Sequence, residues 1–359
     1  MLPEKEIIAR VGDSLAFPPL EVRRIEVEPE FNTASRYRSD LKIDFAWRGK
    51  ELSFVAEVKR QASPKTLDEA IRHLQNYACE TAGFQTSAGY FPLLIVPYLK
   101  PEALDRLIAE DISGIDLSGN GVVIVPGEWF VYRSGAPNRY PSSAPIKNVF
   151  RGTSSLVARV FLMRPGFDSV TEIYEEVKRR GGEITLPTVS KALKALEEEL
   201  LVGRDEKIRP LDPGRLLDML EQSYRRPTGR RRLRGKFTAG RPGGLAALSA
   251  NADVNNMRVV GDDPTRYALM PGGEQSIVIY TPSIETALRG VEFTETARFP
   301  DVELVETDDQ TVYFDRRRGD GFYWTSPLET YLALRAGGKR ERETAEQMRE
   351  EIREYRYYM

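Results

Sequence analysis

Residues 41–59 decide the fold of the N-terminal part of the chain and read LKIDFAWRGKELSFVAEVK. Apolar residues fill two segments, Leu41–Trp47 and Leu52–Lys59, with Arg48, Gly49 and Lys50 between them. β-Branched and aromatic residues favour extended backbone, and glycine favours a turn. The stretch therefore predicts two strands that can pair as a hairpin.

Three charged residues stand inside these apolar segments: Asp44 in the first, Glu57 and Lys59 in the second. Alternate side chains of a strand share a face, so Glu57 and Lys59 project together, and Asp44 can lie beside them in a hairpin. Two carboxylates at one place repel each other, and a hard divalent cation relieves the repulsion. The pattern predicts that Asp44 and Glu57 bind Mg²⁺ or Mn²⁺, with Lys59 assisting hydrolysis. The alternative is an ordinary surface pair of Glu57 and Lys59.

The surrounding sequence alternates between helical and extended patterns. Residues 3–16, 66–82 and 101–110 have helical spacing, whereas residues 92–96 and 121–125 are short apolar segments typical of buried strands. This alternation predicts an α/β domain around a mixed sheet, which we place at residues 1–145.

This order of elements resembles the PD-(D/E)XK nuclease superfamily over roughly residues 1–130. The resemblance implies a restriction-endonuclease-like mixed sheet in which Asp44 and Glu57 bind the metal and Lys59 is catalytic. It also implies a supporting catalytic role for Gln75 in the stretch His73-Leu74-Gln75-Asn76-Tyr77, and Glu6 as the acid of the first helix.

A second region, residues 151–226, has the outline of a winged helix-turn-helix. Helical patterns at 154–163, 170–180 and 186–199 precede a charged turn at 204–207. The third helix is the expected recognition helix. The residues expected to contact DNA there and in the wing are Thr188, Ser190, Lys191, Lys194, Arg204 and Lys207. The alternative is a three-helix module that binds protein.

The third region, residues 227–359, predicts a C-terminal α+β domain. Strand patterns occur at 266–269, 276–280 and 311–314, and Ser326-Pro327 begins a helix that Gly337 ends. At the start of this region, residues 225–241 are rich in arginine and contain no acid. We expect Arg230, Arg231 and Arg232 to lie on a phosphate-facing loop, with a solvated connector as the alternative.

Residues 154–358 resemble the AbiEi-type antitoxins and regulators of type IV toxin–antitoxin systems. The resemblance is carried by VSKALKALE at 189–197, DPGRLL at 212–217 and SPLETYL at 326–332. It implies a winged helix that binds promoter DNA and a C-terminal antitoxin domain with a cognate toxin as partner.

Composition excludes some classes. The 359-residue chain has a net charge of -2, and its single cysteine and single histidine exclude a zinc site built from those residues. No apolar run suits a membrane span and no signal-peptide layout is present, so we expect a cytoplasmic protein that binds DNA and leave a homodimer open. Two hypotheses follow: a metal-dependent DNA nuclease targeted by a winged helix, for defence or DNA processing, or a DNA-binding regulator with a non-catalytic nuclease fold.

Overall fold

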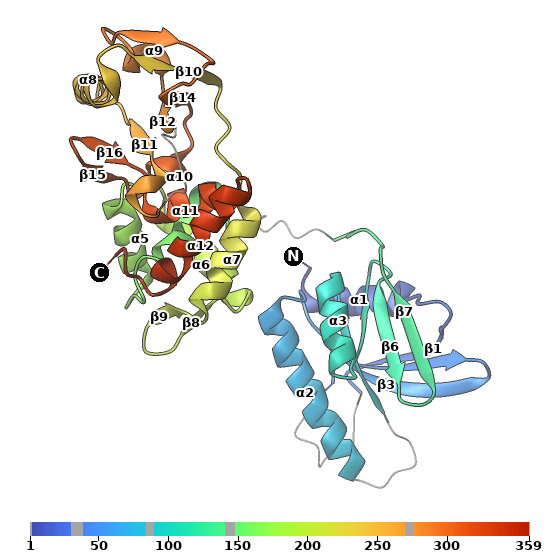
Figure 1. Ribbon diagram of the computed structural model, residues 1–359. Coiled ribbons are helices and arrows are strands. Elements are labelled where there is room, and N and C mark those ends of the chain that lie inside the picture. The colour runs from blue at the N-terminus through green and yellow to red at the C-terminus, as the bar shows by residue number, and fades with distance from the viewer. Residues whose placement is uncertain (1, 30–38, 84–89, 141–147, 270–275, 359) are drawn as a thin grey trace. The chain divides into compact units, whose positions relative to one another are not determined.

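The computed structural model describes residues 2–29, 39–83, 90–140, 148–269 and 276–358. The chain forms two compact units, Met1–Pro145 and Ile146–Met359. Figure 1 shows both units, which are described separately here. In the part of the chain described, no helix combines the length and the apolar character needed to cross a bilayer.

The first unit contains a seven-stranded sheet whose strands follow one another in chain order. The strands are β1 (Glu21–Val27), β2 (Leu41–Trp47), β3 (Lys50–Val58), β4 (Phe91–Val96), β5 (Ser113–Asp116), β6 (Gly121–Val125) and β7 (Trp129–Arg133). Strands β3, β4 and β5 are parallel, and the remaining pairs are antiparallel. The prediction of a mixed sheet in an α/β unit is confirmed.

Helices cover both faces of this sheet. Helix α1 (Glu4–Ser14) buries Ile7 and Val11 in a core with strand residues such as Phe54. Helices α2 (Pro64–Gly83) and α3 (Pro101–Ala109) make the two parallel crossovers and share a second core with Leu94. Because consecutive parallel crossovers have the same hand, both helices lie on one face of the sheet, as Figure 1 shows.

Three strands of the sheet were not predicted. The outermost strands β1 and β7 carry exposed charged and aromatic side chains, including Arg24, Phe130 and Tyr132, so they lack a continuous apolar signal. Strand β5 is four residues long and contains a glycine. In the expected linker at 133–146, residues 134–140 have no helix or strand, and the positions after 140 lie outside the described residues.

The second unit begins with three helices and a hairpin, as predicted for residues 151–226. These elements are α4 (Ser155–Val160), α5 (Val170–Arg179), α6 (Leu186–Glu198), β8 (Val202–Arg204) and β9 (Ile208–Pro210), with η1 (Gly152–Ser154) before them. Helices α7 (Pro213–Ser223), α11 (Pro327–Arg335) and α12 (Lys339–Arg353) share one apolar core with them. A buried ion pair of 2.7 Å joins Arg159 of α4 to Glu329 of α11. The expected boundary near residue 226 therefore crosses a single core.

The rest of the second unit is a seven-stranded mixed sheet in the order β13-β10-β14-β12-β11-β16-β15. Its strands are β10 (Arg231–Phe237), β11 (Val260–Asp262), β12 (Ile277–Thr281), β13 (Phe293–Glu295), β14 (Val302–Glu306), β15 (Arg317–Gly319) and β16 (Phe322–Trp324). Helices α8 (Gly240–Val254) and α9 (Ile284–Ala287) pack on it through a separate apolar core. Figure 1 shows these elements at one end of the unit and α5, α6, α7, α11 and α12 at the other.

Two predicted strands of this region are wrong. Residues 264–266 form a 3-10 turn, η2 (Pro264–Arg266), and residues 310–313 form a short helix, α10 (Gln310–Tyr313). An aspartate precedes each turn, and its side chain accepts a hydrogen bond from a backbone N–H at the start of the turn. Such caps stabilise helical backbone even where the residues have β propensity. The strand predicted at 276–280 is confirmed as β12.

Candidate functional site

The β2–β3 hairpin carries the predicted charged residues, and its register places them. Asp44 stands opposite Ser53, whose Oγ donates a hydrogen bond of 2.6 Å to Asp44 Oδ1. Lys42 Nζ lies 3.9 Å from the same oxygen. Asp44 is buried with these partners, and none of them is a second carboxylate.

The residue that the hairpin brings to Glu57 is Asp40. Leu41 pairs with Ala56, and the Asp40 N–H donates to the Ala56 carbonyl at 3.1 Å. Asp40, the residue before Leu41, therefore faces Glu57, the residue after Ala56. The Val58 N–H donates to Asp40 Oδ2 at 2.7 Å. Asp44 lies four positions after Asp40, and four positions of extended strand span about 13 Å. The prediction that Asp44 lies beside Glu57 is therefore wrong, because the strand register places Asp44 opposite Ser53 and not opposite Glu57.

Glu57 is the centre of a small charged cluster. Lys59 Nζ donates to Glu57 Oε1 at 2.6 Å, and His73 Nδ1 of α2 lies 3.0 Å from Glu57 Oε2. The Glu57 residue is 8% exposed, and Lys59 and His73 are half-buried. The cluster lies at the carboxyl end of β3, where α2 crosses the sheet, so it is neither a surface pair nor part of the apolar core.

The surroundings of Asp40 and Lys59 change the pKa values of both groups. Burial raises the pKa of Asp40, the hydrogen bond from Val58 partly offsets this, and the charge of Glu57 raises that pKa further. Burial alone would lower the pKa of Lys59. The hydrogen bond and charge of Glu57, with the charges of Glu4 and Asp40, outweigh burial and raise this pKa. Lys59 therefore remains an ammonium ion at neutral pH.

Helix α1 contributes a different acid from the one expected. Glu6 forms an ion pair of 2.7 Å with Arg10 on the same helix. The charge of Glu4 instead raises the pKa values of both Asp40 and Lys59. The acid of the first helix that influences the cluster is therefore Glu4.

Gln75 also has a contact outside the cluster. Its Nε2 donates to Glu110 Oε2 at 3.1 Å, which ties α2 to the end of α3. The side chain of Tyr77 lies outside the described residues. Among the side chains of this helix that the structure describes, only His73, which sequence reasoning did not select, lies within ion-pair distance of Glu57.

The residues present fit a weakly coordinated divalent cation. Within the described residues, no group of three or more His, Cys, Asp and Glu side chains has the arrangement of a metal-binding cage. Asp40 and Glu57 supply two neighbouring carboxylates. Mg²⁺ commonly binds proteins through one or two carboxylates and fills its other positions with water and phosphate oxygens. The donor set therefore suits an ion that is bound together with a phosphate substrate.

The expected recognition helix α6 presents free cations. Ser190, Lys191 and Lys194 are exposed, and none has a hydrogen-bond or ion-pair partner in the part of the chain that the structure describes. Thr188 is half-buried, and its hydroxyl lies 2.9 Å from that of Thr185. Val189, Leu193 and other apolar residues face the core from the opposite side of the helix.

The two cations of the adjacent hairpin are already paired. Arg204 of β8 binds Glu197 of α6, and Lys207 lies 3.4 Å from Asp168. Both side chains remain about half exposed, at 49% and 57%. They can reach a phosphate only by sharing or exchanging these carboxylate partners.

The arginine run at 230–232 is a loop only at Arg230, which precedes β10, and the predicted loop is wrong for the other two arginines. Arg231 and Arg232 lie in β10, and the strand alternates exposed basic residues with buried apolar residues and glycine. Arg230 pairs with Asp308 at 2.8 Å, and Arg232 pairs with Glu303 at 2.8 Å. Arg231 is exposed and has no such partner among the residues described. The run itself contains no acid, but acids of the neighbouring segments neutralise most of its charge.

No protein-family model matches the chain, and no curated protein or solved structure matches it either. The function proposed below therefore depends on this geometry and on the sequence patterns.

Proposed function

We propose that the protein is a metal-dependent DNA nuclease whose reaction site is Asp40, Glu57 and Lys59. The observation that carries this proposal is the pairing of Asp40 with Glu57 across the hairpin, with the Lys59 ammonium 2.6 Å from Glu57. The order of elements supports it, since a leading helix, an antiparallel hairpin and a crossover helix are what the PD-(D/E)XK resemblance implies. Asp40 takes the role that the sequence pattern gave to Asp44.

Each residue has a separate task in this proposal. Asp40 and Glu57 would hold Mg²⁺ or Mn²⁺, which polarises a phosphate and lowers the pKa of bound water when present. Lys59 stays protonated, so it binds a phosphate oxygen and balances the negative charge that develops in the transition state. His73 restrains the second oxygen of Glu57 and thereby orients the carboxylate.

DNA targeting is proposed for residues 151–226 as a winged helix. The exposed and unpartnered Ser190, Lys191 and Lys194 on α6 support it, because free cations on one helix face suit phosphate contacts. The hairpin of β8 and β9 would be the wing.

The second candidate is a DNA-binding regulator or antitoxin with a non-catalytic nuclease fold. One observation favours it: Glu57 already has Lys59 and His73 as partners, and the described residues contain no three-ligand metal group. In this case residues 227–359 would bind a cognate toxin, as the AbiEi resemblance implies.

A cleavage assay separates the two candidates. Linear, circular, branched and single-stranded DNA would be incubated with the full chain in Mg²⁺, in Mn²⁺ or in chelator. The nuclease proposal predicts metal-dependent cleavage of at least one substrate and its loss in Lys59→Ala. Absence of cleavage on every substrate, with DNA binding intact, would replace it with the regulator proposal.

A further inference from the structure

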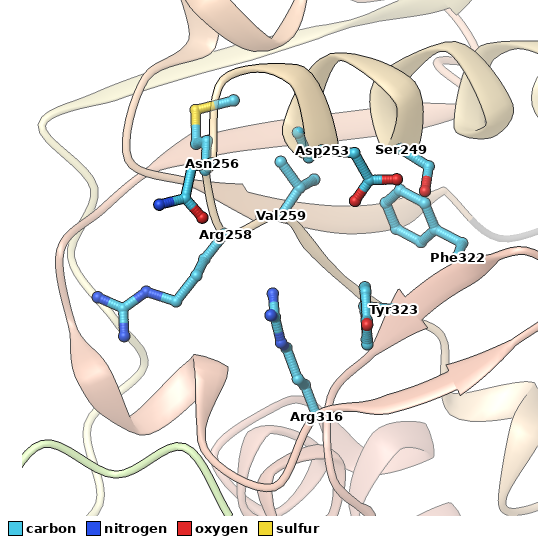
Figure 2. A pocket seen from close by; sticks show the side chains of 10 residues that line it. Ser249, Asp253, Asn256, Arg258, Val259, Arg316, Phe322 and Tyr323 are labelled. Atoms are coloured by element: carbon cyan, nitrogen blue, oxygen red, sulfur yellow. The ribbon is translucent and has the colours of Figure 1, made fainter.

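A pocket in the second unit lies far along the chain from the proposed reaction site. It has a volume of about 180 Å³ and is lined by the end of α8, residues 256–259, Arg316 and strand β16. At about 30 Å³ per water, it can hold roughly six waters or one small polar group. Figure 2 shows the side chain of Arg316 extending into this space between Arg258 and Tyr323.

Arg316 has no carboxylate partner in the part of the chain that the structure describes. It precedes β15, is half-buried, and makes neither an ion pair nor a hydrogen bond with any residue described. Its guanidinium carbon lies 4.2 Å from the centre of the Tyr323 ring. The ring holds the planar guanidinium in place but leaves its N–H donors without acceptors.

Two arginines near Arg316 have hydrogen-bond partners, in contrast to Arg316 itself. Arg317 donates to the Tyr357 carbonyl at 2.8 Å and contacts Asp315 at 3.4 Å. Arg258 donates to Glu183 at 3.0 Å and to Gln310 at 2.9 Å. Both arginines are therefore used to hold the fold together, whereas Arg316 is fixed by stacking alone.

The pocket has more cations than acids in its lining, although Arg258 is already paired with Glu183. Its lining contains Arg258 and Arg316 but only one acid, Asp253. Arg318 does not line the pocket, but its guanidinium carbon lies 5.8 Å from the centre of the same Tyr323 ring. A half-buried cation without a counterion is costly, and a planar guanidinium matches the oxygens of phosphate.

We propose that this pocket binds a phosphate monoester, with Arg316 as its anchor. The small volume admits the phosphate group and leaves the remainder of the ligand outside. Asn256 and Ser249 line the same space and can donate hydrogen bonds to the phosphate oxygens. Asp253 opposes the negative charge of the ligand and limits its affinity. The same phosphate could belong to a free nucleotide or to the end of a DNA strand.

Calorimetric titration of the full chain with inorganic phosphate tests the proposal. Chelator is present throughout, so that a metal at Asp40 and Glu57 does not contribute. Arg316→Gln should weaken phosphate binding about tenfold or more, because the charge-assisted hydrogen bonds are lost. Asp253→Asn should strengthen it about threefold by removing a like charge. The control Arg342→Gln, an exposed arginine of α12, should leave it unchanged.

Two competitors then identify the source of the phosphate. A nucleoside 5′-monophosphate that displaces inorganic phosphate indicates a free ligand. Displacement by a 5′-phosphorylated oligonucleotide, and not by its 5′-hydroxyl counterpart, indicates a strand end. Failure of both to compete overturns the proposal.

Wild-type protein that binds no phosphate up to roughly 10 mM also overturns the proposal, as does equal affinity in Arg316→Gln. If that variant is unfolded by circular dichroism, Arg316→Lys and Asp253→Asn decide. The lysine variant keeps the charge but loses the fork of donors, so its affinity should lie below that of the wild type.

Discussion

Charged side chains lie on strands in both units, but their surroundings differ. At the β2–β3 hairpin, Glu57 is buried and Asp40 is half-buried, and Lys59 Nζ lies 2.6 Å from Glu57 Oε1. On β10, the arginines are exposed, and Arg230 and Arg232 each have a carboxylate partner. Burying like charges together costs free energy, whereas exposed ion pairs cost and contribute little. The difference supports the proposal of a reaction site at the hairpin and favours an ordinary surface role for β10.

The largest expected effect comes from exchanging the two aspartates of the hairpin for asparagine. Asp40→Asn should reduce metal-dependent cleavage by about 10³-fold, because a metal ligand is lost. Asp44→Asn is the matched control: it keeps an oxygen that can accept the hydrogen bond from Ser53, and we expect cleavage within about threefold of the wild type. Initial cleavage rates at saturating Mg²⁺ measure both effects. Equal losses in the two variants would contradict the assignment of Asp40.

A second prediction examines the cost of a buried acid on its own. Asp262 of β11 accepts hydrogen bonds from Thr325 and Thr330 at 3.1 and 2.8 Å. Burial raises the pKa of this carboxyl to about 6 from 3.8, although the threonine hydrogen bonds lower it. A raised pKa means that the folded state prefers the neutral acid. The stabilisation is then complete below the unfolded pKa and is lost as the pH rises through about 6.

The measurement is the free energy of unfolding of wild type and Asp262→Asn at several pH values. The difference between them should change by about 2 kcal/mol from pH 4 to pH 7, in favour of the asparagine variant at the higher pH. A constant cost of the substitution cancels in this comparison. A difference that does not vary with pH would mean that Asp262 titrates normally.

A third prediction concerns the free lysines of α6. Neutralising Lys191 and Lys194 together to glutamine should weaken DNA binding and lower the slope of log affinity against log salt by up to about two. Ser190→Ala, on the same exposed face, should leave the slope unchanged because it removes no charge. Fluorescence anisotropy across a salt series measures both quantities. A folded double variant with an unchanged slope would remove α6 from the DNA interface.

The turn residues of the hairpin contain information on the strand register that the spacing of Asp44, Glu57 and Lys59 does not. Arg48 and Gly49 have φ values of 52° and 79°, so the turn is a two-residue loop that pairs Trp47 with Lys50. Counting outward from that turn pairs position 40 with position 57. The register, and with it Asp40, could thus be predicted, whereas the motif spacing alone favoured Asp44.

Other features depend on contacts distant in the sequence. The acids that pair with the arginines at β10 lie on β14 and beyond, at Glu303 and Asp308, so the run itself appeared unneutralised. His73 reaches Glu57 only because α2 crosses the sheet at that point. Periodicity predicted the long helices because they have one apolar face, and the buried strands because both of their faces are apolar. It missed β1 and β7, since edge strands expose much of their surface.

The smallest expected effect compares two neighbouring arginines of β10. Arg232 is neutralised by Glu303, whereas Arg231 is exposed and unpaired among the described residues. If β10 is an ordinary surface strand, Arg231→Gln and Arg232→Gln should each change DNA affinity by less than about twofold, as expected of exposed charges outside an interface. If β10 contacts phosphate, Arg231→Gln should lower the salt slope by about one and Arg232→Gln by less, because Glu303 already neutralises Arg232. The same anisotropy series distinguishes these outcomes, and the second would return β10 to the DNA interface even though it is a strand and not the expected loop.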